Sequence, residues 1–285
     1  MSKPLILGHR GVMLNGALPY QNSLPAFRLA LARGDGLETD ACLSRDGEIF
    51  LVHEASYLDQ VAYTLEEHLD GPSRARVNGR RLDQMTQAEI RTLRLLSAEP
   101  IPTLKETLAL FEDKAKVLNI ELKGQGVFRA LIPLLRQTLA SGRIEAGQLI
   151  LSSSDIPALL ELRQGLPQLK RGAVLGPPHS PRAPMYPWSG DTRSCYLPVT
   201  AATLSSAELQ AADLDYLVIP DSAATPEVFS LIKKLQPGKQ VIVWVYSEMG
   251  SHDAGAFNRM VAENAPDGFL HAVIVDSFAA PVYTL

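Results

Sequence analysis

The chain alternates short apolar runs with longer segments of helical periodicity, and this alternation restricts its fold more than any other feature. Eight runs have the length and the β-branched content of buried strands. They span residues 5–8, 36–44, 116–123, 148–153, 170–176, 215–220, 240–246 and 271–277. Because strand–helix repeats indicate parallel strands with crossover helices, eight units within 285 residues predict an α/β fold, a (β/α)8 barrel of the TIM type.

Helix signals lie between the runs, and two segments interrupt the repeat. For example, Ser23 is a candidate N-cap and Gly34 a candidate C-terminal residue of one helix, and the residues between them have helical apolar periodicity. The expected helices lie within 23–34, 127–142, 155–166, 225–238 and 254–268. Residues 55–102 make a poor strand and predict an insertion with one or two short helices, whereas the Pro- and Ser-rich stretch 177–204 predicts a long loop. We expect a single barrel domain over residues 1–285.

Composition excludes several functional classes. The formal net charge of −4, without a long Lys/Arg cluster, argues against nucleic acid or an anionic membrane as a partner. Cys42 and Cys195 lie far apart, so no disulfide framework or zinc site is expected, and Cys42 is predicted to be a buried thiol. The first residues hold only a short apolar stretch, which predicts a soluble cytoplasmic protein without a stable membrane anchor. The chain has no P-loop, dinucleotide fingerprint or nucleophile elbow.

Acidic residues gather where the predicted strands end. Glu38 and Asp40 are two apart in one strand, so both point to one face, and Asn119, Glu121 and Lys123 share a face in the next. An isolated pair of this kind is commonly solvated at a sheet edge. Inside a barrel, however, unpaired carboxylates are costly to bury, so converging acids require a cation. Carboxylate ligands without clustered Cys or His favour Mg²⁺ or Ca²⁺ over zinc.

Two histidines are placed to join these acids. His9 follows the first strand in the run GHRG, beside Arg10, and His53 ends a run whose alternation puts it on one side with Ile49 and Leu51. An imidazole with a pKa near neutrality can act as either acid or base. The remaining histidines lack convincing partners and are predicted at the surface or in loops: His68, His179, His252 and His271.

Five motifs in this order carry a family resemblance through Lys123. GHRG, QNSLPAF, ETDACLSRDGEIFLVHE, IPTLKETL and NIELK together resemble the glycerophosphodiester phosphodiesterase family, with weaker agreement in LILSSS, VIVWVY and AVIVDSF. The resemblance implies a TIM-type barrel that uses one divalent cation, Mg²⁺ or Ca²⁺, to hydrolyse a phosphodiester bearing a neighbouring hydroxyl. It also implies that Glu38, Asp40 and Glu121 are metal ligands and that His9 and His53 are the catalytic acid/base pair.

The implied chemistry assigns roles to the remaining polar residues. Arg10 and Lys123 are expected to bind the phosphate and to neutralise charge on its oxygens. One histidine takes the proton of the neighbouring hydroxyl as it attacks phosphorus, and the other protonates the leaving alkoxide. The product is a cyclic phosphate, which water opens with the histidine roles reversed.

Three departures from the family pattern alter the surroundings of the site. Gln21-Asn22-Ser23 stands where Glu-Asn-Thr is usual, Glu54 replaces an Asp, and WVY replaces Trp-Thr-Val-Asn. These changes put the usual glycerol headgroup in question. Trp244 and Tyr246 share a strand face and are candidates for an apolar or sugar-stacking wall of the substrate pocket. Trp244 fits equally well as a side chain that fills the interior of the barrel.

Two alternatives accompany the leading hypothesis of a hydrolase for glycerophosphodiesters or related sugar or polyol phosphodiesters. A lipid phosphodiesterase similar to lysophospholipase D or sphingomyelinase D requires an exposed apolar rim beside the site, and no amphipathic docking segment is evident. A non-catalytic phosphate-binding barrel is expected to have lost a histidine or a metal carboxylate. All five of those residues are present.

Overall fold

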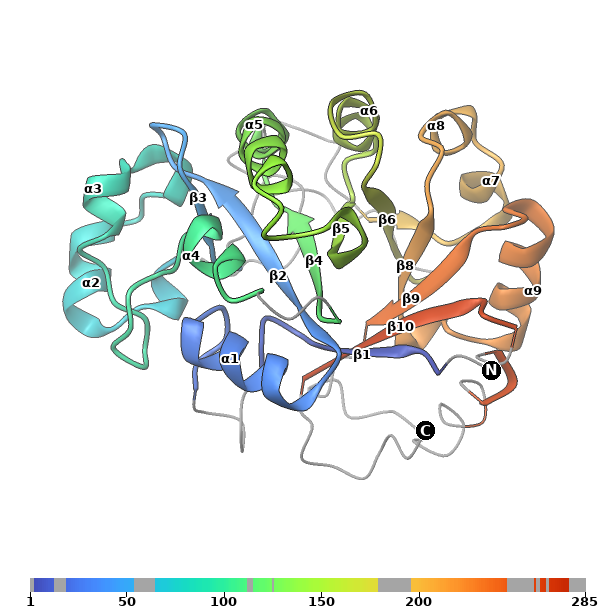
Figure 1. The fold of residues 1–285 in the computed structure, drawn as a ribbon, viewed down its shortest axis with the longest axis horizontal. Coiled ribbons are helices and arrows are strands. Elements are labelled where there is room, and N and C mark those ends of the chain that lie inside the picture. Colours follow the sequence, from blue (N-terminus) through green and yellow to red (C-terminus); the bar gives the residue numbers. More distant parts are fainter. Residues whose placement is uncertain are drawn as a thin grey trace.

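Eight parallel strands close into a barrel in the computed structural model of the chain (Figure 1). The structure describes residues 3–12, 19–53, 65–111, 115–124, 126–178, 196–244, 259, 262–264 and 267–276. The barrel strands are β1 (Leu5–Gly8), β2 (Gly36–Leu43), β4 (Val117–Leu122), β5 (Leu149–Ser153), β6 (Lys170–Gly176), β8 (Tyr216–Pro220), β9 (Gln240–Trp244) and β10 (Leu270–Val275). Neighbouring strands pair in this order, and the pairing of β1 with both β2 and β10 closes the circle. The predicted (β/α)8 fold is confirmed.

Helices surround the barrel, and their ends follow the capping signals in the sequence. They are α1 (Leu24–Arg33), α5 (Val127–Ala140), α6 (Ile156–Gly165), α7 (Ala201–Leu204), α8 (Ala207–Ala211) and α9 (Pro226–Leu235). The Ser23 side chain accepts a hydrogen bond from the Ala26 N–H at the start of α1, and Gly34 ends that helix. Four of the five expected helices are confirmed, and most of the fifth, at 254–268, lies outside the described residues.

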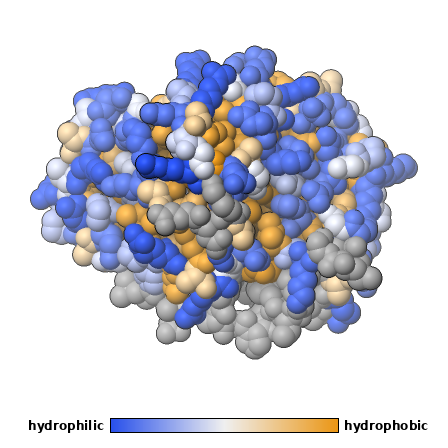
Figure 2. Space-filling view, in the orientation of Figure 1, coloured by the Kyte–Doolittle hydropathy of each residue, from blue (hydrophilic) through white to orange (hydrophobic). Residues whose placement is uncertain are grey.

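Hydrophobic side chains form one layer inside the barrel and another between barrel and helices. Inside, alternate strand residues meet across the barrel axis, among them Leu7, Ile150, Val218 and Ile242. Hydrophilic residues cover the outer sides of the helices, and hydrophobic residues show between them (Figure 2). No helix among the described residues combines the length and the apolar character needed to cross a membrane.

The predicted insertion forms a small unit beside the barrel, at the left of Figure 1. Within residues 55–102 it contains η1 (Leu65–His68), α2 (Gly71–Val77), η2 (Leu82–Gln84) and α3 (Gln87–Ile90). It is preceded by β3 (Ile49–Leu51), which pairs antiparallel to β2, and followed by α4 (Leu104–Leu108). A separate apolar cluster joins this unit to the buried side chains of Cys42 and Phe50, so Cys42 is the buried thiol that the sequence predicts.

Three short elements complete the described structure: η3 (Ala146–Gln148), β7 (Leu197–Pro198) and η4 (Asp221–Ala223). β7 pairs with β6, and Thr200 caps α7, whose N-terminal turn therefore lies within the stretch expected to be a loop. The predicted loop at 177–204 is thus structured from Leu197 onward, because Thr200 supplies an N-cap that the Pro-rich composition obscured.

Gly36 provides a test of barrel closure, because it pairs with Leu7 of β1 and Val117 of β4. A Cβ atom at this position would lie 1.9 Å from the Val117 carbonyl oxygen. We expect Gly36→Ala to destabilise the protein by about 2 kcal/mol or more. The added Cβ would clash with backbone atoms of β4, which cannot move aside as the end of a flexible side chain can. The exposed Gly147, where an added Cβ meets nothing within 4 Å, is the control, and Gly147→Ala is expected to change stability by less than about 0.5 kcal/mol. Equal urea midpoints for the two variants would contradict this account.

Candidate active site

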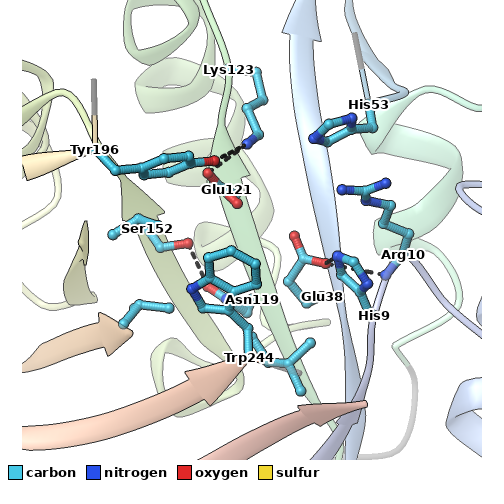
Figure 3. Close-up of a pocket in the computed structure, with 13 residues that line it drawn as sticks. His9, Arg10, Glu38, His53, Asn119, Glu121, Lys123, Ser152, Tyr196 and Trp244 are labelled. Carbon is cyan, nitrogen blue, oxygen red and sulfur yellow. Dashed lines mark hydrogen bonds and ion pairs between the residues drawn. The ribbon is translucent and has the colours of Figure 1, made fainter. Parts of the chain in front are cut away.

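The polar side chains that the sequence singled out meet at the C-terminal ends of the barrel strands. His9 and Arg10 directly follow β1, and Lys123 directly follows β4. Strand register places Glu38 opposite Asn119 and Asp40 opposite Glu121. The pocket between them (Figure 3) is lined by His9, Arg10, Glu38, His53, Asn119, Glu121, Lys123, Ser152, Val174, Tyr196, Val218, Trp244 and Ile274.

Three carboxylates form the centre of the site. Glu38, Asp40 and Glu121 each place a carboxylate oxygen within 4.8 Å of the others. Asp40 is almost fully buried and does not line the pocket; its Oδ2 lies 3.1 Å from the Arg10 Nε and accepts a hydrogen bond of 3.1 Å from the Asn22 amide. These are the acids that the sequence proposed as metal ligands, and the fold brings them together.

Two cations balance the acids in part. Lys123 Nζ lies 2.7 Å from a Glu121 oxygen and 3.7 Å from an Asp40 oxygen. Arg10 pairs with Asp40 through its guanidinium and donates its backbone N–H to Glu38 over 3.1 Å. Among the described residues, the three closely spaced carboxylates are thus contacted by two positively charged side chains.

The pKa values distinguish Glu38 from Asp40. Burial raises the pKa of Glu38 well above its ordinary value, and the nearby charges of Asp40 and Glu121 raise it further. Burial also acts to raise the pKa of Asp40, but His53, Arg10 and Lys123 outweigh it and hold that pKa below its usual range. A carboxylate that is costly to ionise beside two others is the environment that a divalent cation relieves, so the residues present fit an oxygen-bound metal ion.

His9 is oriented by a carboxylate that the sequence analysis missed. Its Nδ1 hydrogen bonds to Asp276, which directly follows β10. Because a carboxylate only accepts, Nδ1 carries the proton. The Nε2 atom therefore faces the pocket, 4.0 Å from Glu38 Oε2. The signal for Asp276 was present, since it is an acidic residue that directly follows an apolar strand run.

His53 lines the same pocket and lies between β3 and the insertion. His53 is 2% exposed, and its backbone carbonyl accepts a hydrogen bond from His68. In Figure 3, His9, Arg10 and His53 lie along one side of the pocket, across from Lys123, Glu121 and Tyr196. The two candidate acid/base groups thus flank the guanidinium that is expected to bind phosphate.

The expectation that His68 and His271 lie at the surface or in loops is wrong. His68 is buried between the insertion and the barrel, where its Nδ1 lies 3.0 Å from the Tyr20 hydroxyl. His271 lies within β10, half-buried, with its ring stacked at 4.5 Å between centroids on Tyr216. His179 and His252 lie outside the described residues.

Aromatic residues form the opposite wall. The rings of Tyr196 and Trp244 lie 6.3 Å apart between centroids, and Lys123 Nζ donates to the Tyr196 hydroxyl over 3.2 Å. Tyr196 was missed because it lies in the stretch expected to be a loop, where no periodicity gives a side chain's direction. Tyr246 and the altered Glu54 lie outside the described residues, whereas the altered Gln21 accepts a hydrogen bond of 2.8 Å from Arg10.

Comparisons with known proteins identify a family that the chain matches. The model of the glycerophosphoryl diester phosphodiesterase family matches residues 9–244. A glycerophosphodiester phosphodiesterase of Caldanaerobacter subterraneus subsp. tengcongensis is 29% identical over 186 residues, which cover 60% of this chain and 67% of that protein.

Solved structures share the fold. A phosphodiesterase of Oleispira antarctica, solved in complex with the product sn-glycerol-3-phosphate, has a TM-score of 0.64 at 21% identity, covering 96% of this chain and 93% of its own. A glycerophosphodiester phosphodiesterase of Thermotoga maritima has a TM-score of 0.58 at 20% identity, covering 97% of this chain and 96% of its own.

Buried His68 predicts a loss of stability in acid. Burial first, then the charges of His53 and Arg10, lower the His68 pKa from 6.5 to about 4. Between these pH values the unfolded chain binds a proton at His68 and the folded chain does not, so stability falls as the pH falls. At about 1.4 kcal/mol per pKa unit, the full effect is about 3 kcal/mol.

Urea denaturation of the wild type and of His68→Gln between pH 7 and pH 4 measures this effect, because the variant lacks the titrating group. We expect the free energy of unfolding to fall less steeply with decreasing pH in His68→Gln. Parallel curves for the two proteins would show that His68 is not buried in its neutral form.

Proposed function

Because the chain belongs to the glycerophosphoryl diester phosphodiesterase family, and is therefore a phosphoric diester hydrolase, we propose that it acts on glycerophosphodiesters or related small sugar or polyol phosphodiesters. The observation that carries this proposal is the meeting of Glu38, Asp40 and Glu121 in a pocket flanked by His9 and His53. The glycerol phosphate bound by the Oleispira antarctica protein supports a glycerol-containing substrate.

Glu38, Asp40 and Glu121 are the residues that would hold one divalent cation, Mg²⁺ or Ca²⁺. When bound, that ion supplies charge neutralisation for the phosphoryl oxygens. The fit follows from the charges on the protein. Burial and the neighbouring charges of Asp40 and Glu121 raise the Glu38 pKa, so it is costly to ionise all three acids together. A divalent cation held by the three carboxylates would offset that cost.

Arg10 and Lys123 bind and orient the phosphate in this proposal. Asp40 and Gln21 hold the Arg10 guanidinium beside the pocket, so its remaining donors are fixed in direction before substrate arrives. Lys123 contacts Glu121 and Tyr196 and adds a second positive charge across the pocket. Donors fixed in advance stabilise the charge that develops on phosphorus oxygens without reorganising.

The two histidines transfer protons. One takes the proton from the substrate hydroxyl next to the phosphate as that oxygen attacks phosphorus, and the other donates a proton to the departing alkoxide. Asp276 keeps the His9 Nδ1 protonated, so Nε2 is the atom that exchanges a proton within the pocket. The resulting cyclic phosphate is opened by water with the two roles exchanged.

We also propose that the enzyme works in the cytoplasm. Cys42 is buried, and the sequence spacing of the two cysteines fits no disulfide framework, which suits a reducing compartment.

Glu38 is the most direct test of the metal site. We expect Glu38→Gln to weaken the binding of Mg²⁺ or Ca²⁺ by at least about tenfold, or about 1.4 kcal/mol, because one charged ligand is lost. Isothermal titration calorimetry measures this without substrate. Glu208→Gln, at an exposed position on α8, is the matched control and should bind the ion as the wild type does. Unchanged affinity in Glu38→Gln would place the cation elsewhere.

The proton-transfer assignment is tested by removing each imidazole. We expect His9→Ala and His53→Ala each to lower kcat by about 10² or more, because each removes one proton-transfer group. The control is His271→Gln, which removes a half-buried histidine from the start of β10, away from the pocket. Its kcat should equal that of the wild type. Near-normal turnover by either alanine variant, in protein that melts cooperatively, would overturn the two-histidine mechanism.

A further inference from the structure

A chain of hydrogen bonds runs behind the pocket from the insertion to the loop after β1. His68 Nε2 bonds to the backbone carbonyl oxygen of His53, and His68 Nδ1 lies 3.0 Å from the Tyr20 hydroxyl. His68 and His53 are each 2% exposed, so water does not compete strongly for these bonds. Tyr20 and His68 are 48 residues apart in sequence, and neither lines the pocket.

The chemistry of the groups fixes the direction of every bond. A carbonyl oxygen only accepts, so His68 Nε2 must carry a proton. With its pKa lowered to about 4, His68 is neutral near pH 7, and its Nδ1 then has a lone pair only. The Tyr20 hydroxyl therefore donates to Nδ1, and His68 donates in turn to His53.

Gln21 extends the chain to the phosphate-binding arginine. Its side-chain oxygen accepts a hydrogen bond of 2.8 Å from the Arg10 guanidinium, which leaves its amide nitrogen as a donor. Gln21 directly follows Tyr20 in the sequence, so the Tyr20–His68 bond and the Gln21–Arg10 bond start from adjacent residues. Arg10 and the His53 carbonyl are thus linked through Gln21, Tyr20 and His68.

We infer that Tyr20 and His68 are positioning residues, which hold the backbone of His53, and with it the imidazole, in register with Arg10. The inference rests on the proposed function, in which His53 transfers a proton and Arg10 binds phosphate. It assigns a role to the insertion, which supplies His68.

Kinetics of matched variants separate positioning from stability. Tyr20→Phe removes one hydroxyl and keeps the ring, His68→Leu removes both ring nitrogens, and His68→Gln retains a donor for the His53 carbonyl. Val77→Ala, in the core of the insertion and away from the chain of hydrogen bonds, is the control for simple destabilisation. All are assayed with a glycerophosphodiester and divalent cation.

We expect Tyr20→Phe and His68→Leu to lower kcat by about tenfold or more, because a misplaced proton-transfer group loses its alignment with the reacting atoms. KM should change by less than about twofold, since Arg10 keeps its contacts to Asp40 and Gln21. His68→Gln should recover most of kcat, and Val77→Ala should retain the kcat of the wild type. Losses of kcat that merely follow the losses of melting temperature across all four variants would overturn the inference.

Histidine ¹⁵N NMR of the substrate-free protein tests the same chain without turnover, so failure of the inference is distinguishable from failure of the proposed function. We expect the His68 signals to report a neutral ring protonated at Nε2, and Tyr20→Phe to shift the ring signals of both His68 and His53. Val77→Ala should leave the His53 signals in place. The positioning role would be refuted if the His68 ring were protonated at Nδ1, or if the His53 ring signals did not shift in Tyr20→Phe.

Discussion

The burial of three carboxylates within 4.8 Å of one another is the constraint on which the rest of the site depends. Parallel pairing of β2 with β4 puts Glu38 and Asp40 level with Asn119 and Glu121, so the acids cannot separate without breaking the barrel. Like charges held together in a buried place are unfavourable unless cations join them. The contacts of Arg10 and Lys123, and the raised pKa of Glu38, are consequences of this arrangement.

The turn after β1 shows how the chain supplies one of those cations. Arg10 has φ of 51°, in the left-handed region that non-glycine residues seldom occupy, and Asn22 has the same φ. Three bonds stabilise the strained turn: Arg10 donates its N–H to Glu38, the Asn22 N–H donates to the Arg10 carbonyl over 2.8 Å, and the Asn22 side chain binds Asp40. Strain held by several contacts is typical of functional sites, and here it directs the guanidinium toward Asp40 and the pocket.

Sequence patterns predicted the parts of the site that depend on strand periodicity. The side-chain period of two, combined with a parallel barrel, brings Glu38, Asp40 and Glu121 to one end, because strand register leaves little freedom. Contacts between distant segments carried no such signal. His68 reaches His53 only through the docking of the insertion, and Tyr196 enters from a stretch without periodicity. Asp276 is an intermediate case, since its position after a strand could be read from the sequence but its pairing with His9 could not.

The most direct test of the central claim is phosphorus NMR of the purified protein with a glycerophosphodiester and with an analogue in which hydrogen replaces the hydroxyl next to the phosphate. Each substrate is followed with Mg²⁺, with Ca²⁺ and with a chelator. The account predicts that a cyclic phosphate or a phosphomonoester appears only from the substrate that keeps its hydroxyl, and only with a divalent cation. Equal hydrolysis of the analogue, or turnover that persists in chelator, would contradict it.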